Sequence, residues 1–159
     1  MRGTCVVEVG YKPGMADSAG RSLREGIRHL GQRGIKKVTT SQLYRLVGGL
    51  SAQDRERIAK DLLCDPIVQE VRDAMGAPDP KARRAPCAVV DVWYKSGVTD
   101  VVGESVLKGI RDLQVTGVQE VRTGLRYRLW GLVRAEPARR IASALLANPL
   151  VHDSFIHVD

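Results

Sequence analysis

The sequence is poor in the residues that most often carry chemistry. Aromatic residues make up 4% of its 159 positions, and there are three cysteines and three histidines. Cys5, Cys64 and Cys87 are odd in number and lack Cys-x-x-Cys spacing, which favours reduced structural thiols over disulfides or a metal site. No apolar run approaches the length of a membrane span, and the N-terminus does not resemble a signal peptide. We therefore expect a cytoplasmic protein that binds no metal or cofactor.

What the sequence does contain is an internal repeat. Residues 6–76 align with residues 89–159 at a constant offset of 83 without a gap, and 28 of the 71 pairs are identical. A unit of this size lies near the lower limit for an independent core, so each copy should gain by burying apolar surface against the other. We predict a first repeat (1–76), a linker rich in proline and basic residues (77–86) and a second repeat (87–159), which form an internal pseudo-dimer.

The same order of elements is predicted in each repeat. An alternating strand comes first, and Asp17 or Asp100 is placed to cap a helix that should end at Gly34 or Gly117. A second helix then runs up to an Asp-Pro or Asn-Pro pair, and an extended segment follows it. Between the two helices we predict two short strands, over 35–40 and 43–49 in the first repeat and over 118–123 and 126–133 in the second. The order β-α-β-β-α-β predicts an α+β protein of two fused ferredoxin-like units, each with an antiparallel sheet and both helices on one face.

Two features suggest that each repeat makes close contacts with the other repeat or with a partner protein. Gly26 and Gly109 lie inside the predicted first helices, where glycine costs about 1 kcal/mol relative to alanine. Close backbone approach would explain them, and a surface glycine retained since the duplication is the alternative. The apolar residues Val89, Trp93, Trp130 and Leu132 fall on the strand phase that faces away from the helices. The other repeat or a partner protein should cover that surface.

Candidate catalytic groups are few. None of the histidines, His29, His152 and His157, has a counterpart in the other repeat, which excludes a duplicated active site built on histidine. Lys12 and Lys95 follow the first strands, where each could hold a phosphate or a partner carboxylate, or lie in a solvated turn. Three classes of function stay open at this point: a protein scaffold, a small-molecule sensor that binds at the interface between the repeats, and a nucleic-acid-binding module.

A family resemblance narrows these classes. The second repeat carries three ordered segments: Trp93-Tyr-Lys95-Ser-Gly97-Val98-Thr-Asp100, Gly117-Val-Gln-Glu-Val121-Arg122-Thr-Gly124 and Leu145-Leu146-Ala147-Asn148-Pro149. Over nearly its whole length it resembles the small PurS subunit of phosphoribosylformylglycinamidine synthase. The first repeat matches more weakly, because Thr40-Ser41 replaces Thr123-Gly124. Both repeats also lack the Asp-Pro that the family usually has at the start of the first helix, which leaves the cap intact but loosens the helix start.

The resemblance implies a role in purine biosynthesis. A PurS subunit is not catalytic by itself and holds a glutaminase (PurQ) against an ATP-dependent synthetase (PurL), so that ammonia from glutamine reaches the substrate. The tandem chain would be a covalent form of the PurS dimer. We expect the partners to contact the loops after the first strands and several strand residues: Lys12, Gly14, Arg45, Trp93, Lys95, Gly97, Arg122, Gly124, Arg128 and Trp130. Because Trp93 aligns with Gly10 and Trp130 with Val47, the second repeat should be the more adhesive half.

Overall fold

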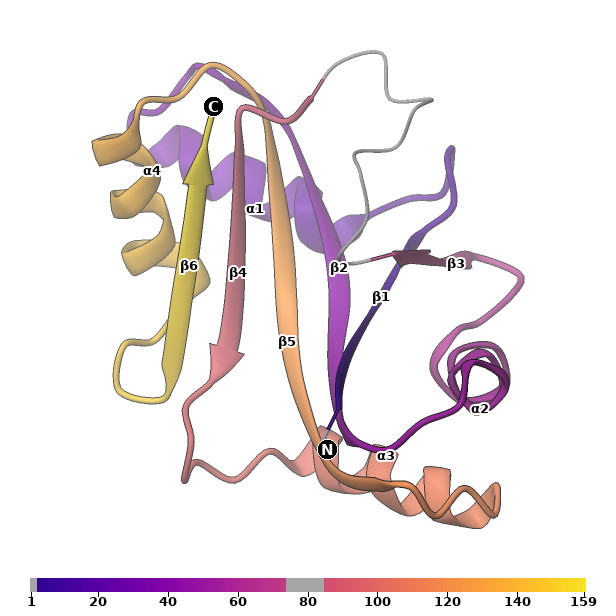
Figure 1. The fold of residues 1–159 in the computed structure, drawn as a ribbon. Coiled ribbons are helices and arrows are strands. Elements are labelled where there is room, and N and C mark those ends of the chain that lie inside the picture. The colour runs from indigo at the N-terminus through magenta and orange to yellow at the C-terminus, as the bar shows by residue number, and fades with distance from the viewer. Residues whose placement is uncertain (1–2, 74–84) are drawn as a thin grey trace.

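The chain folds around one six-stranded antiparallel sheet with the strand order β3-β1-β2-β5-β4-β6 (Figure 1). The structure is a computed structural model that describes residues 3–73 and 85–159, so most of the predicted linker lies outside the described residues. The strands are β1 (Thr4–Tyr11), β2 (Ile35–Gly48), β3 (Gln69–Asp73), β4 (Ala88–Tyr94), β5 (Val118–Gly131) and β6 (His152–Val158). The helices are α1 (Ser18–His29), α2 (Ala52–Arg57), α3 (Val101–Asp112) and α4 (Ala135–Ile141), and α2 and α4 continue as the π-helical segments η1 (Ile58–Leu63) and η2 (Ala142–Leu146). The α+β class and the ferredoxin-like character of the two halves are confirmed.

The prediction of two short strands between the helices is wrong. In each repeat the two segments form one continuous strand of 14 residues. The expected hairpin bend falls at Ser41-Gln42 or at Gly124-Leu125, and neither pair resembles the Asn-Gly or Asp-Gly sequences that favour two-residue turns. Instead of folding back, β2 and β5 pair with each other along their whole length. The two separate sheets that we predicted are therefore one sheet.

The register of the central strands places a pseudo-two-fold axis at the middle of the sheet. Gln42 and Leu125 are equivalent positions of the two repeats, and they lie directly opposite each other in the ladder between β2 and β5. Equivalent elements therefore lie on opposite sides of this pair, and β3 and β6 form the two outer edges. The predicted pseudo-dimer thus has its interface in the two longest strands.

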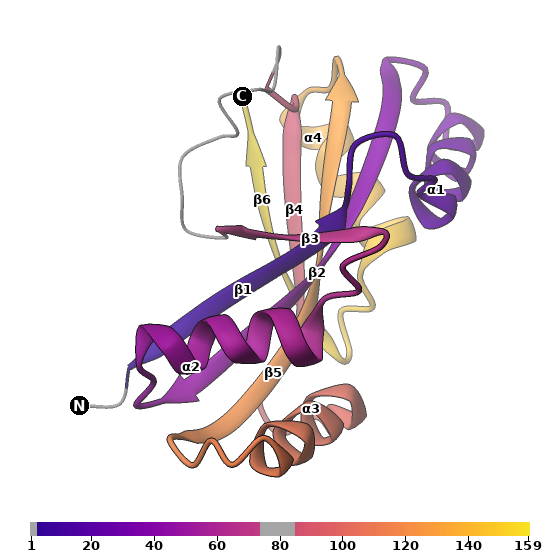
Figure 2. The same ribbon diagram turned by 90° about the vertical axis from the view of Figure 1, so that its right-hand side faces the viewer.

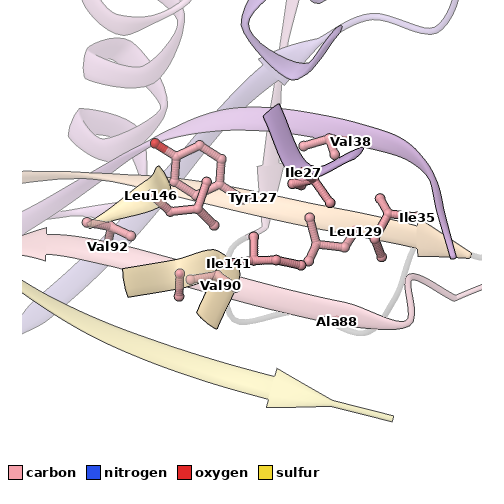
Figure 3. Packing of buried hydrophobic residues seen from close by; sticks show 11 residues of the cluster. Ile27, Ile35, Val38, Ala88, Val90, Val92, Tyr127, Leu129, Ile141 and Leu146 are labelled. Atoms are coloured by element: carbon pink, nitrogen blue, oxygen red, sulfur yellow. The ribbon is translucent and has the colours of Figure 1, made fainter. Parts of the chain in front are cut away.

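Each hydrophobic core contains helices from both repeats. In one core, α1 of the first repeat packs with α4 and η2 of the second over β4 and parts of β2 and β5 (Figures 1 and 3). Ile27 of α1 and Ile141 of α4 are fully buried there. In the other core, α3 of the second repeat packs with η1, the continuation of α2 in the first repeat (Figure 2). Because the long strands do not fold back, each first helix is carried over to the other repeat, and neither core can form from one repeat alone.

The glycines inside the first helices mark these exchanged helix contacts. A Cβ on Gly109 would lie 2.8 Å from Cδ1 of Leu62, and one on Gly26 would lie 3.4 Å from Cδ1 of Leu145. Leu62 and Leu145 are equivalent residues in the π-helical segments. The nearest atoms are leucine side-chain atoms rather than backbone, so the close backbone approach expected at these glycines is not what the structure has. The contact lies between a first helix of one repeat and the continuation of a second helix of the other, and it is tight only at Gly109.

The helix starts agree with the sequence, whereas the helix ends do not. Asp17 and Asp100 are the N-caps of α1 and α3, and each accepts a hydrogen bond of 2.8 Å from the backbone N–H three residues later. The helices stop at His29 and Asp112, earlier than Gly34 and Gly117. Those glycines instead allow backbones to touch, since a Cβ on Gly117 would lie 1.8 Å from the Gly49 carbonyl oxygen. Within residues 3–73 and 85–159, no helix is long and apolar enough to cross a membrane.

Candidate functional site

One face of the sheet carries the helices, and we call the other the helix-free face. Alternate residues of each strand point to it, because successive side chains of a strand point to opposite faces. Six residues predicted to contact partners share this face: Arg45, Trp93, Arg122, Gly124, Arg128 and Trp130. The remaining four, Lys12, Gly14, Lys95 and Gly97, lie in the loops that follow β1 and β4. The structure therefore divides the predicted residues between a central surface and two loops.

The centre of the helix-free face holds a buried ion cluster that sequence reasoning missed in part. The side chain of Glu8 on β1 is 1% exposed, and its carboxylate reaches across β2 to two arginines of β5. Arg128 Nη2 donates to Glu8 Oε2 over 3.0 Å, and Arg126 Nη1 donates to the same oxygen over 2.9 Å. Arg126 also donates two hydrogen bonds, of 2.7 and 2.8 Å, to Asp91 on β4. We call Glu8, Asp91, Arg126 and Arg128 the ion cluster.

The ion cluster sets the charge of its buried acid. Burial alone would raise the pKa of Glu8, but hydrogen bonds and attraction from Arg128, a hydrogen bond from Ser41 and attraction from Arg126 together hold that pKa below its ordinary value. The pKa of Arg126 is raised, chiefly by its hydrogen bonds to Asp91. Glu8 and Arg126 are therefore charged at neutral pH, and the cluster joins the two repeats electrostatically.

The lowered pKa of Glu8 predicts a specific pH dependence of stability. A carboxyl group with a lower pKa in the folded state stabilises the protein above its unfolded pKa, about 4.3 for glutamate, and this stabilisation is lost as the pH falls through the folded pKa. The difference in unfolding free energy between the native chain and Glu8→Gln should thus be constant above about pH 5 and shrink below about pH 4. Urea titrations at a series of pH values measure it. A difference that grows in acid would contradict the prediction.

The ion cluster is asymmetric although the sheet is nearly symmetric. Glu8 corresponds to Asp91, and Arg128 corresponds to Arg45, but the counterpart of Arg126 in the first repeat is Leu43. Because both arginines belong to the second repeat, Glu8 is ion-paired with the other repeat. The cluster therefore favours pairing of a first repeat with a second one over pairing of two first repeats.

A second contact between the repeats surrounds Trp93. The guanidinium of Arg45 on β2 stacks over the Trp93 ring at 4.2 Å from its centroid, which is a favourable cation–π geometry. Beneath the ring lies Gly124, where a Cβ would stand 2.8 Å from ring carbon Cδ2 of Trp93 and 2.6 Å from the Val92 carbonyl oxygen. Trp93 is 6% exposed. The apolar surface expected at Trp93 is thus covered by the first repeat, and Gly124 makes room for the ring.

Arg122 and Trp130 lie towards the two ends of β5. Arg122 pairs with Glu120 at 2.6 Å and donates a hydrogen bond of 3.1 Å to the Val98 carbonyl in the loop after β4. Trp130 is half-buried and its indole N–H points to the Thr39 hydroxyl at 3.4 Å. Leu132, which we expected on this face, lies beyond the end of β5 and is 83% exposed. The predicted strand residues therefore do not form one continuous patch.

The two Tyr-Lys-x-Gly loops form equivalent corners at opposite ends of the molecule. The backbone N–H of Lys12 donates to the Val68 carbonyl over 3.0 Å, and that of Lys95 donates to the Val151 carbonyl over 2.9 Å. Each loop is thereby joined to the turn before the last strand of its repeat. We call residues 12–15 with 66–68 the first corner, and residues 95–98 with 149–151 the second corner. Because β1 and β4 are antiparallel through the sheet, the corners lie far apart (Figure 1).

Both corners expose an apolar side chain, which we call the tip, beside a turn whose glycine has a positive φ. Gly14 and Gly97 have φ of +83°, a backbone conformation that favours glycine. The tips are Ile67, which is 78% exposed, and Leu150, which is 82% exposed. Large apolar side chains this exposed are candidates for burial against a partner. The sequence signal for them was available, because Ile67 and Leu150 are equivalent apolar residues directly after the two helix-breaking prolines.

The two corners differ in the apolar side chains near them and in the contacts of their lysines. It leads into α3 with two exposed valines, Val101 and Val102, where the first repeat has Ser18 and Ala19. Lys12 donates a hydrogen bond to the Pro66 carbonyl, whereas the Lys95 ammonium has no such partner among the residues that the structure describes. An ammonium in the same corner as the exposed Leu150 can meet a partner carboxylate at the rim of an apolar contact.

A groove of about 330 Å³ opens on the helix-free face beside β6. It is lined by Val89, Asp91, Arg126, Phe155, Ile156 and His157. Asp91 and Arg126 belong to the ion cluster and are already bonded to each other. The outer rim is formed by Phe155, which is 62% exposed.

Comparison with known families gives a match to both repeats. The family model described as PurS, phosphoribosylformylglycinamidine (FGAM) synthase, matches residues 4–75 and again residues 87–159. The two matched stretches fall on the two repeats and cover most of the chain. No curated protein gives a significant match.

Proposed function

The chain belongs to the PurS family as a tandem-duplicated member, which makes it a PurS-type subunit of FGAM synthase, and we propose that it holds the glutaminase subunit (PurQ) against the synthetase subunit (PurL). In this role it contributes no reacting group. It holds the two active sites in a fixed relative position so that ammonia released from glutamine reaches the synthetase. The observation that carries the proposal is the duplication itself: one chain contains both halves of a paired PurS unit, joined along β2 and β5.

The covalent pairing supports a scaffold in a specific way. Two separate PurS subunits must first associate, whereas the two repeats of this chain are already held at a high effective concentration. Each exchanged helix makes one repeat necessary for the core of the other. A scaffold of this kind presents both corners in a fixed relation, which is what two different enzymes need in order to be held together.

The unequal corners support unequal partners. A partner that buries Leu150 and the two valines of α3 would gain most of its affinity from apolar area, and Lys95 would orient it by charge. In the first corner Ile67 and Met15 are also exposed, but the Lys12 ammonium is hydrogen-bonded to the Pro66 carbonyl. We assign the tighter contact to the second corner.

Comparing turnover with glutamine and turnover with ammonia as the nitrogen source tests the proposal. Glutamine-dependent turnover by the cognate synthetase and glutaminase should fall by about 10²-fold or more when this chain is left out, because the glutaminase loses its effective concentration at the synthetase. Turnover with ammonia should survive the omission. If both activities are indifferent to the chain, and it fails to co-elute with either enzyme, the scaffold role is wrong.

Matched substitutions test the assignment of the corners. Leu150→Asp should weaken binding of the tighter partner by about tenfold or more, since burying a leucine contributes about 1.5–3 kcal/mol. Ile67→Asp alters the equivalent tip of the first corner and serves as the matched comparison. Titration calorimetry with each partner measures both variants. An equal or larger loss of binding by Ile67→Asp would overturn the assignment of the corners. It would not bear on the scaffold role, which the comparison of glutamine with ammonia tests.

A further inference from the structure

The outer edge of β6 is an unpaired strand edge with little protection against pairing. β6 pairs with β4 over seven residues without a register shift, and on its other side the described residues place no strand. Edge strands are usually blunted by lysine, proline or a bulge. The β6 sequence, His-Asp-Ser-Phe-Ile-His-Val, contains neither lysine nor proline. Its backbone can therefore accept another strand.

The hydrogen-bond pattern fixes which residues face outward. The Lys95 N–H donates to the Val151 carbonyl, and the Asp159 N–H donates to the Cys87 carbonyl. In an antiparallel ladder these bonds recur at every second residue, so Asp153, Phe155 and His157 direct their backbone groups to β4. Ser154 and its alternate neighbours, His152, Ile156 and Val158, direct their N–H and C=O groups outward. These four residues are the template for an added strand.

The sequence of β6 is complementary to itself when it is paired antiparallel about its middle residue. With Phe155 opposite Phe155 of a second copy, Asp153 falls opposite His157, and this pair occurs twice. All three residues lie on the helix-free face and are exposed. In this register they form the non-hydrogen-bonded pairs, whose side chains approach most closely. An aromatic pair would thus lie between two acid–histidine pairs.

We propose that β6 is the interface with a second copy of this chain, which extends the sheet of one molecule into that of the other. Phe155, which is 62% exposed at the rim of the groove, becomes covered by its symmetry mate. Because the arrangement is two-fold and closed, it gives a dimer rather than a filament. This inference does not depend on the proposed scaffold role.

The equivalent edge, β3, is less suited to the same contact. The counterpart of Phe155 there is Arg72, which folds over its own repeat and donates to the Tyr11 carbonyl over 2.8 Å and to Glu70 over 3.1 Å. Pairing two copies about Arg72 would place like charges opposite each other, which is destabilising. His157 on β6 also has a partner in its own chain, Asp159 at 3.3 Å, but that pair is exposed, so β6 is the better edge to pair.

The duplication supplies a matched pair of proline substitutions as the test. Ser154→Pro removes an outward N–H of β6 and leaves the ladder to β4 intact. Val71→Pro does the same at the equivalent residue of β3, where the outward parity follows from the bond between Lys12 N–H and the Val68 carbonyl. Sedimentation velocity over a concentration series should show the native chain at twice its mass of 17.4 kDa. Ser154→Pro should sediment as a monomer, and Val71→Pro should remain dimeric.

Other outcomes overturn the proposal. A native chain that stays monomeric at all concentrations refutes it, and so does a dimer that survives Ser154→Pro. A dimer lost in both variants, with both still folded by circular dichroism, would indicate head-to-tail pairing of β3 with β6 instead. Loss in Val71→Pro alone would move the interface to β3.

A cross-link tests the register without disturbing the backbone. Phe155→Cys places two thiols opposite each other at a Cα distance of about 4.5 Å, within the range for a disulfide. It should form a covalent dimer under mild oxidation. Asp153→Cys separates the two thiols by four residues along the strands, about 13 Å, and should not. The native chain, whose three cysteines are half-buried, sets the background. Failure of Phe155→Cys to cross-link, or equal cross-linking by both variants, would overturn the register.

Discussion

Replacing Glu8 with glutamine should lower the free energy of unfolding by about 3 kcal/mol, at the low end of the range for breaking a buried ion pair because its partners are partly exposed. The side chain of Glu8 is 1% exposed, and those of Arg126 and Arg128 are 16% and 20% exposed. Glutamine keeps the shape but removes the charge, which deprives both Arg126 and Arg128 of their ion pairs with Glu8. Urea unfolding at neutral pH measures the loss as a lower midpoint with an unchanged slope.

A surface ion pair of similar geometry provides the control. Glu120 pairs with Arg122 at 2.6 Å on the same face, but its side chain is 49% exposed. Exposed pairs contribute about 0.2–1 kcal/mol, so Glu120→Gln should change the stability by less than about 1 kcal/mol. If the two substitutions cost the same, burial does not govern the ion cluster, and its role in joining the repeats would have to be abandoned.

The order of elements could be read from the sequence, but the exchange between repeats could not. Alternation in β1, the caps at Asp17 and Asp100 and the prolines after the second helices are local signals, and the first strands, the helices and the last strands that they predict are present. Whether a segment such as 35–48 bends into a hairpin or continues depends on its partner strand. The pattern of buried residues is nearly the same in both cases, because period two is kept throughout. The absence of a turn pair near Ser41 was the one local sign.

The ion cluster shows a similar limit. Glu8 lies within the apolar run Val-Val-Glu-Val, and Asp91 occupies the equivalent place in the second repeat, so buried acids could have been suspected from the sequence. Their partners could not, because Arg126 and Arg128 are about 120 residues from Glu8 and reach it only through the pairing of β2 with β5. Arg128 was selected from the sequence as a partner-binding residue. Its bonds to Glu8 indicate that it first serves the pairing of the repeats.

Trp93 illustrates how divergence between copies builds an interface. In the sequence it was an apolar residue on an exposed phase, and its counterpart is Gly10. In the fold it fills the space above Gly124 and beneath Arg45. The second repeat gained a ring where the first repeat supplies a cation. The same division, in which one repeat carries a group and the other its complement, holds for Glu8 and its arginines, and it is how a duplicated chain comes to pair its two unlike halves.

The largest effect of a small substitution on stability is expected at the end of the pairing between β2 and β5. Gly48 closes β2 with φ of +143°, and a Cβ there would lie 2.0 Å from the carbonyl oxygen of Gly117 in the second repeat. Alanine at this position must either separate the two backbones or leave a conformation that L-residues rarely adopt. Backbone strain of this kind costs about 1–3 kcal/mol by itself, and the steric overlap adds to it. Gly48→Ala should therefore destabilise the chain by about 3 kcal/mol or more.

Gly49→Ala is the control for Gly48→Ala, because it makes the same change of residue at a position without steric overlap. A Cβ on Gly49 would point into open space, with nothing within 4 Å, so Gly49→Ala should be neutral or slightly stabilising, because alanine restricts the unfolded chain. Thermal unfolding of both variants under the same conditions gives the comparison. Gly131, the counterpart of Gly48, has φ of +128° and a Cβ position 2.2 Å from the Gly34 carbonyl oxygen, and Gly131→Ala should reproduce the loss. Equal stability of the two neighbouring alanine variants would mean that the ends of β2 and β5 separate freely, and the rigid relation of the two corners on which scaffolding depends would then lack its structural basis.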